Sequence, residues 1–223
     1  MLAKIAMPPS LSTICSGSGR QRALKNYVQW PMPADTVLAG SNVTLTLAQE
    51  SDAADLFAVL NHDSVWTHVR GRPNTAGELA ATLGAANEGG RWPWVVRQSG
   101  AVVGTTSYLE VSPVDARLEI GFTLYTPAVW GTAVNPECKL LLMTWAFEVS
   151  GMGRVQLKTD SRNVRSQEAI ARLGATEEGV LRQYQRRQDD SVRDTVMYSV
   201  VADEWPAVKA GLLERLGNSK EAS

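Results

Sequence analysis

Residues 130–135 have the residue types of a turn that could bind an anion through its backbone. Gly131 and Ala133 leave the neighbouring N–H groups uncovered. Asn135 is a good helix N-cap, and Pro136 suits the first position of a helix. The unpaired N–H groups and positive dipole end of such a helix attract phosphate, although Glu137 already uses part of that dipole. Taken alone, the turn fits better an ordinary capped connection between a strand and a helix, because short glycine-containing loops are common.

Two familiar phosphate loops are missing from the sequence. It contains no Gly-x-x-x-x-Gly-Lys-Ser/Thr motif, and no Gly-x-Gly-x-x-Gly follows a strand near the start of a domain. These absences argue against a P-loop nucleotidase and against a Rossmann dinucleotide site. An anion bound at residues 130–135 would therefore belong to another class of ligand.

The composition of the chain is that of one globular domain. Its 223 residues and net charge of −1 suit a single domain with a full core and offer no electrostatic case for nucleic acid. The two cysteines, Cys15 and Cys138, have no metal-like spacing, so we expect neither a disulfide framework nor a metal site. No apolar run approaches the ~20 residues of a membrane helix. We expect a cytoplasmic protein without a membrane or nucleic-acid partner.

The N-terminal residues 1–36 differ in composition from the rest of the chain. They are rich in Ser, Pro and Gly and contain no acidic residue before Asp35. This composition predicts a disordered extension. It is also similar to that of a transit peptide, but Pro8 and Pro9 interrupt any amphipathic helix. We therefore expect a folded domain at 37–216 and a flexible tail at 217–223.

Hydrophobic periodicity predicts alternating strands and helices. Alternating apolar residues predict strands, whose ranges are 43–47, 94–97, 102–109, 117–124, 155–158, 178–186 and 192–201. Apolar stripes with capping residues predict helices, whose ranges are 54–60, 75–87, 136–150, 164–173 and 203–216. The order indicates an α+β fold with a mixed sheet and one parallel crossover through the helix at 136–150.

Both histidines lie between the first two predicted helices, in a polar loop at 61–73. His62 and His68 are six residues apart, which matches neither one helical face nor a recognised metal-ligand motif. The loop also contains Trp66 and two arginines. It could line a binding site, or it could be a solvated connection.

The chain resembles the GCN5-related N-acetyltransferase (GNAT) superfamily, in its RimJ/RimL-type branch. The matching segments recur in the family's order and spacing, and they are 118–122, 130–135, 158–160, 162–166, 169–170, 173–175, 178–182, 193–199 and 204–206. The resemblance covers about residues 35–216. It implies a twisted, mostly antiparallel sheet of about six or seven strands flanked by helices. In that fold the fourth and fifth strands, here at 117–124 and 155–158, splay apart.

The resemblance implies that acetyl-CoA is the cofactor. The family's turn after the fourth strand holds the pyrophosphate of coenzyme A with backbone N–H groups; here it comprises Trp130, Gly131, Thr132, Ala133, Val134 and Asn135. The pantetheine arm would pair with backbone near Leu124 and Lys158. By the same resemblance Asn163 hydrogen-bonds this arm and Ser166 lies near the sulfur, although Asn163 also fits a helix N-cap and Ser166 a first-turn residue. Ala128 stands where the family has a basic residue or Gln.

The reaction implied by the resemblance is acetyl transfer to an amine by direct attack in a ternary complex. Glu119 is the first candidate for the general base, because a carboxylate in a half-closed cleft can have a raised pKa. The alternative is a cross-strand salt bridge of Glu119 with Arg117 or another arginine. A backbone N–H near Leu124 or Tyr125 is the natural donor to the oxyanion.

Two further departures from the family pattern concern residues that assist catalysis. In many relatives a tyrosine in the helix after the fifth strand acts as the general acid. This chain has no tyrosine in that helix, and Ser166 is the replacement suggested by the RimL-type branch. Gln185 falls about where that branch has a glutamate. These departures motivate an alternative hypothesis, a non-catalytic acyl-CoA-binding or sensor module of the same fold.

The acceptor pockets of the superfamily are built from two loops, which correspond here to 61–73 and 184–193. The candidate substrate-binding residues are Trp66, His68, Tyr108 and Tyr184. The arginines that suggest an acidic or phosphate-bearing acceptor are Arg182, Arg186 and Arg187. The leading hypothesis is an N-acetyltransferase whose acceptor is a primary amine: a protein N-terminus, an aminoacyl nucleotide or an amine-bearing small molecule. A homodimer is possible by the same resemblance.

Overall fold

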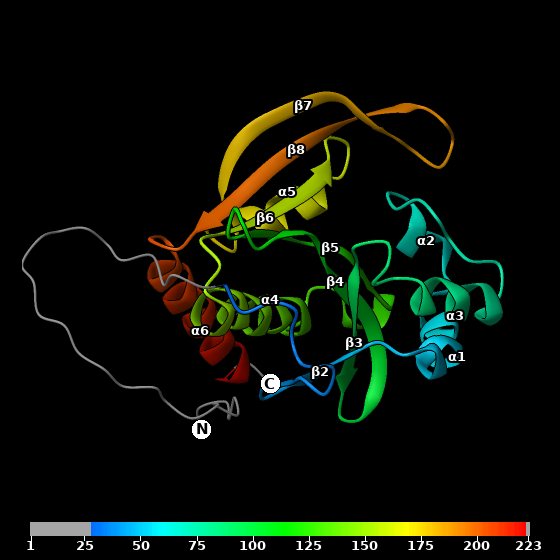
Figure 1. Ribbon diagram of the computed structural model, residues 1–223, viewed down its shortest axis with the longest axis horizontal. Coiled ribbons are helices and arrows are strands. Elements are labelled where there is room, and N and C mark those ends of the chain that lie inside the picture. The colour runs from blue at the N-terminus through cyan, green and yellow to red at the C-terminus, as the bar shows by residue number, and fades with distance from the viewer. Residues whose placement is uncertain (1–27, 222–223) are drawn as a thin grey trace, which may run out of the picture.

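A computed structural model describes residues 28–221, with side chains described up to residue 218. One sheet of eight strands in the order β1-β2-β3-β4-β5-β6-β8-β7 runs through the molecule (Figure 1). The strands are β1 Val37–Ala39, β2 Val43–Leu47, β3 Trp92–Gln98, β4 Ala101–Ser112, β5 Arg117–Tyr125, β6 Arg154–Asp160, β7 Thr176–Arg186 and β8 Val192–Val201. Neighbouring strands are antiparallel except β5 and β6. The predicted α+β class and the single parallel crossover are confirmed, with one strand more than expected.

Helices cover both faces of the sheet. They are α1 Ala53–Leu60, α2 Asp63–Trp66, α3 Ala76–Gly84, α4 Val134–Thr144, α5 Val164–Ala171 and α6 Trp205–Glu221. In Figure 1, α4 and α6 lie together on one side of the sheet and α1 to α3 lie near the end of β3 and β4. Successive residues of β3 alternate between two hydrophobic clusters: Trp94 and Val96 belong to the cluster that contains α4 and α6, and Val95 to the one that contains α1 and α3.

The parallel pairing between β5 and β6 is short. Only Arg117, Leu118 and Glu119 of β5 have partners on β6, and β5 then continues to Tyr125 without pairing on that side. Beyond Glu119 the two strands diverge, as the predicted splay requires. Because β5 and β6 are parallel, the helices that follow them, α4 and α5, begin at the same edge of the sheet.

A bulge interrupts the pairing of β5 with β4 within the splayed half of β5. The register shifts between the pairs Thr105–Leu124 and Ser107–Gly121, and Phe122 adopts a left-handed φ of 46°. Gly104 faces this bulge, and a Cβ there would lie 2.2 Å from the carbonyl oxygen of Leu124. A side chain at Gly104 is therefore incompatible with the close approach of the two strands.

The crossover helix begins slightly earlier than its capping residues predict. Its N-cap is Ala133, no side chain caps it, and Asn135 lies inside the first turn. Pro136 takes the third helical position, which is tolerated because the N–H groups of the first turn have no intrahelical acceptor. The predicted N-cap at Asn135 and first position at Pro136 are thus wrong by about half a turn. Every residue from Pro136 to Thr144 is buried, and the last turn, Trp145–Ser150, is π-helical.

Glu137 serves a different purpose from the one its position in the first turn predicts. Its side chain points into the protein, where its carboxylate accepts hydrogen bonds from the backbone N–H groups of Ser41 (2.6 Å), Asn42 (2.8 Å) and Val43 (3.1 Å). A Cβ at Gly40 would lie 2.6 Å from the same carboxylate. Glu137 therefore fixes the turn between β1 and β2 against the start of α4.

Both predicted boundaries of the domain need correction. Trp30 packs edge to face against Trp92, Tyr108 and Trp145, and Met32 is buried, so the folded part includes at least residues 28–36 of the predicted extension. Residues 1–27 lie outside the described part of the chain. At the other end, α6 continues to Glu221, past the predicted end of the helix at residue 216. The sequence analysis also missed the short elements β1 and α2.

Removal of the Glu137 carboxylate should destabilise the whole domain. We expect Glu137→Ala to lower the free energy of unfolding in urea by ~2–4 kcal/mol, because three backbone donors lose their acceptor. The matched control is Glu214→Ala, an exposed residue of α6, which should change it by less than ~0.5 kcal/mol. Equal stability of the two variants would contradict this role.

Candidate active site

The turn between β5 and α4 presents free backbone donors. Within the described part of the chain, the N–H groups of Gly131, Ala133 and Asn135 have no protein acceptor. Gly131 has a φ of 78°, and a Cβ placed on it would meet no atom within 4 Å. Thr132 stabilises the turn internally, because its hydroxyl donates to the carbonyl of Val129 at 2.7 Å. The turn is exposed at Gly131 and Thr132 and is suited to a phosphate group.

Trp130 links this turn to α5. Its indole N–H donates to the carbonyl of Tyr125 at 3.0 Å, which fixes the ring beside the end of β5. The guanidinium carbon of Arg165, in the first turn of α5, lies 3.9 Å from the centroid of that ring. The sequence analysis did not identify Arg165. It had no local signal, because the stack depends on two helix starts that meet only in the fold.

Two predicted cofactor residues, Asn163 and Ser166, lie together at the start of α5. Asn163 is the N-cap, and its side-chain oxygen accepts from the N–H of Ser166 at 3.1 Å. The helix-capping role of Asn163 that the sequence allowed is therefore present. Leu124 and Val134 have buried side chains, so only their backbone groups could serve a cofactor.

An ion-pair cluster of two buried side chains, Glu119 and Lys158, and the exposed Glu110 lies where β5 and β6 separate. The ammonium nitrogen of Lys158 lies 2.8 Å from Glu119 Oε2 and 2.6 Å from Glu110 Oε1. Gln156 also donates to the other oxygen of Glu110, at 2.9 Å. The salt bridge predicted as an alternative for Glu119 therefore exists, but its partner is Lys158; Arg117 pairs instead with Asp115 at 3.5 Å.

The surroundings of Glu119 favour its protonated form relative to water. The side chain is only 6% exposed, and Gly121 makes room for it, because a Cβ there would lie 2.5 Å from Glu119 Oε1. Burial raises the pKa of Glu119, and the charge of Lys158 partly offsets this rise. For Lys158, burial alone would lower the pKa, but its two carboxylate partners raise it above the ordinary value. Lys158 thus stays charged.

Lys139 is a buried cation near this cluster that the sequence analysis missed. It lies on α4 with 5% of its surface exposed, and its ammonium donates to Thr123 Oγ1 at 3.0 Å. No carboxylate of the described residues lies within ion-pair distance of it. Burial lowers the pKa of Lys139 to about 8. Its neighbour Cys138 is also buried, which raises the pKa of the thiol to about 12 and makes it a poor nucleophile.

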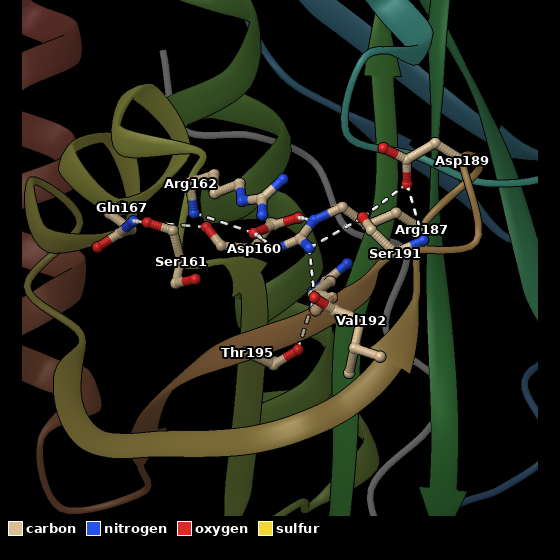
Figure 2. A network of polar contacts seen from close by, with 10 residues as sticks. Asp160, Ser161, Arg162, Gln167, Arg187, Asp189, Ser191, Val192 and Thr195 are labelled. Carbon is tan, nitrogen blue, oxygen red and sulfur yellow. Dashed lines mark hydrogen bonds and ion pairs between the residues drawn. The ribbon is translucent and has the colours of Figure 1, made fainter.

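A polar network ties the β7–β8 hairpin to the end of β6 (Figure 2). The guanidinium of Arg187 contacts both carboxylate oxygens of Asp160, at 2.6 Å and 2.9 Å, and also donates to the carbonyl of Val192. Asp160 in turn accepts from the N–H of Arg162. Burial acts to raise the pKa of Asp160, but the hydrogen bonds from Arg187 and Arg162 lower it below the ordinary value. Arg187 is therefore paired with a carboxylate within the protein. Of the two arginines with which it was grouped, Arg186 is exposed and donates to the carbonyl of Asp190, at 3.2 Å, and Arg182 is exposed.

The two loops expected to form the acceptor pocket do meet. The N–H of Gly71, between α2 and α3, donates to the side chain of Gln188 in the hairpin turn at 3.2 Å. Tyr184 of β7 is 42% exposed, and its ring centroid lies 5.3 Å from the ammonium of Lys158. The fold thereby brings Tyr184 next to Lys158, the ion-pair partner of Glu119.

The other predicted substrate residues are less suitable. Tyr108 is fully buried, and its hydroxyl donates to the carbonyl of Leu142 at 2.7 Å, so it belongs to the core and does not wall a pocket. Trp66 is 8% exposed; it borders a hollow lined also by Phe57, Leu60 and Arg72, but its indole N–H is bonded to the carbonyl of Leu60. His68 is half-buried. No group of side chains among residues 28–218 has the arrangement of a metal site.

The position of Lys139 leads to a pH-dependent prediction about stability. Between its folded pKa of about 8 and its ordinary value of 10.5, the unfolded chain binds a proton that the folded chain releases. As the pH rises from about 8 to 10.5, the contribution of Lys139 to the free energy of unfolding therefore increases. Below pH 8 the buried charge destabilises the folded protein most. We expect Lys139→Met to stabilise the protein by about 3 kcal/mol near pH 7, with a gain that shrinks towards pH 10.5.

Urea unfolding of wild type and variant at both ends of that window measures the effect. Lys209→Met, at an ion-paired lysine on the surface of α6, is the control and should show no such trend. A stability difference for Lys139→Met that is the same at both pH values would contradict the depressed pKa.

Comparisons with known proteins agree with this geometry. A solved structure of an acetyltransferase from T. thermophilus is 38% identical, with a TM-score of 0.76, and the match covers 84% of this chain and all of that one. A GCN5-related N-acetyltransferase from Brucella melitensis is 26% identical, with a TM-score of 0.78, over 86% of this chain and 90% of that chain. The uncharacterized N-acetyltransferase YoaA of Bacillus subtilis (strain 168) is 26% identical over 74% of this chain and 96% of its own length.

The structure of RimL, a ribosomal L7/L12 alpha-N-protein acetyltransferase, was solved in complex with coenzyme A. It is 18% identical to this chain, with a TM-score of 0.68, over 75% of this chain and 98% of its own, which shows a shared fold.

No helix among the described residues is both long and apolar enough to cross a membrane. The family model for the acetyltransferase (GNAT) domain matches residues 42–176, more than half of the chain. The chain therefore belongs to the GNAT family and is an N-acetyltransferase that uses acetyl-CoA.

Proposed function

We propose that this enzyme transfers the acetyl group of acetyl-CoA to a primary amine by direct attack in a ternary complex, with Glu119 as the general base. The proposal rests mainly on the position of Glu119. Its carboxylate is almost completely buried, and Glu119 is the last residue of β5 that pairs with β6, so it lies where the two strands separate. A base is needed there because an amine is protonated at neutral pH and must lose a proton to attack a thioester.

Residues on both sides of the splay fit the cofactor. The free N–H groups at Gly131, Ala133 and Asn135 would bind the pyrophosphate. The unpaired edge of β5 beyond Glu119 offers backbone groups to the amides of the pantetheine arm, and Asn163 and Ser166 lie at the start of α5 at the same edge of the sheet. Acetyl-CoA supplies the activated acetyl group as a thioester.

The ion pair with Lys158 sets the working state of Glu119. Because Lys158 remains charged, it opposes the rise in pKa that burial causes and favours the ionised form of Glu119, which can accept a proton directly or through water. Glu110 adds a second negative charge beside the first. Two carboxylates face one ammonium in this cluster, and this local excess of negative charge would attract a cationic amine. The more distant cations Arg193 and Lys139 reduce that excess.

The proposed acceptors share a primary amine. A protein N-terminus and an amine-bearing small molecule both present an ammonium group that the cluster could attract. The loop at Gly71 and the hairpin turn at Gln188 would border it, together with Tyr184, which lies beside Lys158. Three arginines of the hairpin were expected to attract an acidic acceptor. Because Arg187 is bound to Asp160, only Arg182 and Arg186 of these three lack a carboxylate partner among the described residues.

Substitution of the base should reduce turnover without loss of cofactor affinity. We expect Glu119→Gln to lower kcat by ~100-fold or more, because general-base catalysis contributes that much. The assay is thiol release from acetyl-CoA with a panel of peptide N-termini and small primary amines, and calorimetry measures cofactor affinity. The control is Glu110→Gln, which removes the other, more exposed partner of Lys158 and should lose much less activity.

Equal loss in the Glu119 and Glu110 variants would assign the effect to the ion pair with Lys158 and would contradict a base at Glu119. Amine-independent thiol release by the wild-type enzyme across the whole panel would contradict acetyl transfer to an amine.

The hydroxyl of Ser166 is the candidate proton donor to the departing thiolate. We expect Ser166→Ala to lower kcat by less than ~10-fold, because a thiol with a pKa of about 8.5 leaves readily without an acid. The measurement is the pH profile of kcat for the variant and the wild type. A loss as large as that of Glu119→Gln would show that acid assistance is essential.

A further inference from the structure

The phosphate-binding turn lacks a cation of its own. The family pattern places a basic residue or Gln at its first position, but here that position is Ala128, which is exposed. The turn's amides are neutral donors, and the diphosphate of coenzyme A carries two negative charges. Charged donors form hydrogen bonds with phosphate roughly twice as strong as neutral donors do. The turn by itself therefore leaves this charge unneutralised.

Arg165 places a guanidinium beside the turn from another element. It lies in the first turn of α5, with its guanidinium carbon 3.9 Å from the centroid of the Trp130 ring. Trp130 directly precedes Gly131, whose N–H is one of the free donors. The stack exists because α4 and α5 follow two parallel strands and begin at the same edge of the sheet.

The guanidinium of Arg165 has no acidic partner in the described part of the chain. Among residues 28–218, no carboxylate lies within 4.0 Å of it, whereas Arg154, Arg172 and Arg187 each have an acidic partner. The side chain is exposed. Stacking on an aromatic ring fixes the plane of a guanidinium and leaves its edge N–H groups free to bind an anion.

We propose that Arg165 supplies the missing cation and pairs with the diphosphate of coenzyme A, with Trp130 as the residue that positions it. This inference rests on the proposed use of the turn at Gly131 as the pyrophosphate site. It adds a cofactor-binding residue from α5 that replaces the basic residue lost at Ala128. The cofactor would then bridge the starts of both helices, and its diphosphate would be held by amides from one side and by a guanidinium from the other.

Calorimetric titration of the full chain with acetyl-CoA and with its 3′-dephospho analogue tests this assignment. We expect Arg165→Ala to weaken binding of both cofactors by the same factor, ~10-fold at low salt, as for one exposed charge-assisted contact. Arg165→Lys should recover only part of the loss, because an ammonium keeps the charge but lacks the planar fork. The difference between wild type and Arg165→Ala should shrink at high ionic strength.

Arg172→Ala is the matched control. It removes the same charge from the end of the same helix, at a residue that pairs with Glu168 at 3.6 Å, and it should change affinity by less than ~2-fold. Thermal unfolding of each variant establishes that it is folded.

Three outcomes would overturn the assignment. Equal affinities of Arg165→Ala and Arg172→Ala would show that Arg165 does not contact the cofactor. A loss seen with acetyl-CoA but not with the dephospho analogue would assign Arg165 to the 3′-phosphate instead of the diphosphate. No binding of acetyl-CoA by the folded wild-type protein would overturn the proposed cofactor turn together with this inference, so the two failures are distinguishable.

Discussion

The early end of the pairing between β5 and β6 is the constraint on which the rest of the structure depends. Three residue pairs hold the strands together, and beyond Glu119 each strand leaves one edge of its backbone unpaired towards the other. An unpaired backbone inside a sheet is costly unless a ligand or water satisfies it. The sheet therefore has a built-in site for an extended ligand that carries amide groups. The pantetheine arm of coenzyme A is such a ligand.

The polar residues of the site follow from this divergence. At its closed end, Glu119, Lys158 and Glu110 form a charged cluster that would have no place in a continuous sheet core. At its open end, the helices α4 and α5 begin side by side, with Trp130 and Arg165 in contact. In the proposed function, this one divergence supplies both the carboxylate that accepts a proton and the helix starts that bind phosphate. Glu119 lies within β5 and the turn follows the end of that strand, which is the order of thioester and diphosphate along the proposed cofactor.

Strong tertiary contacts hold the elements that border the divergence. Glu137 attaches the start of α4 to the turn between β1 and β2, and Asp160 attaches the end of β6 to the β7–β8 hairpin through Arg187. Each uses a carboxylate with several donors, which is a stable arrangement for a buried charge. Lys139 is the exception. Among the described residues, its buried ammonium has only a neutral acceptor, the hydroxyl of Thr123. The fold tolerates its cost next to the negatively charged cluster, with which it interacts favourably over a longer distance.

The sequence by itself determined the α+β class and the order of the elements except β1 and α2, because periodicity and capping residues are encoded within a few neighbours. The anion turn and the candidate base Glu119 came from the family resemblance and stay predictions. The sequence analysis misplaced the cap at Asn135 and the domain start at residue 37, since the packing of α4 and of Trp30 overrides local preference. It assigned Tyr108 to a pocket and Arg187 to an acceptor, although both are engaged inside the protein. Only the tertiary structure decided that Glu119 pairs with Lys158 and that Arg165 stacks on Trp130. These contacts join residues that are 39 and 35 positions apart, brought together by a parallel crossover that no local pattern specifies.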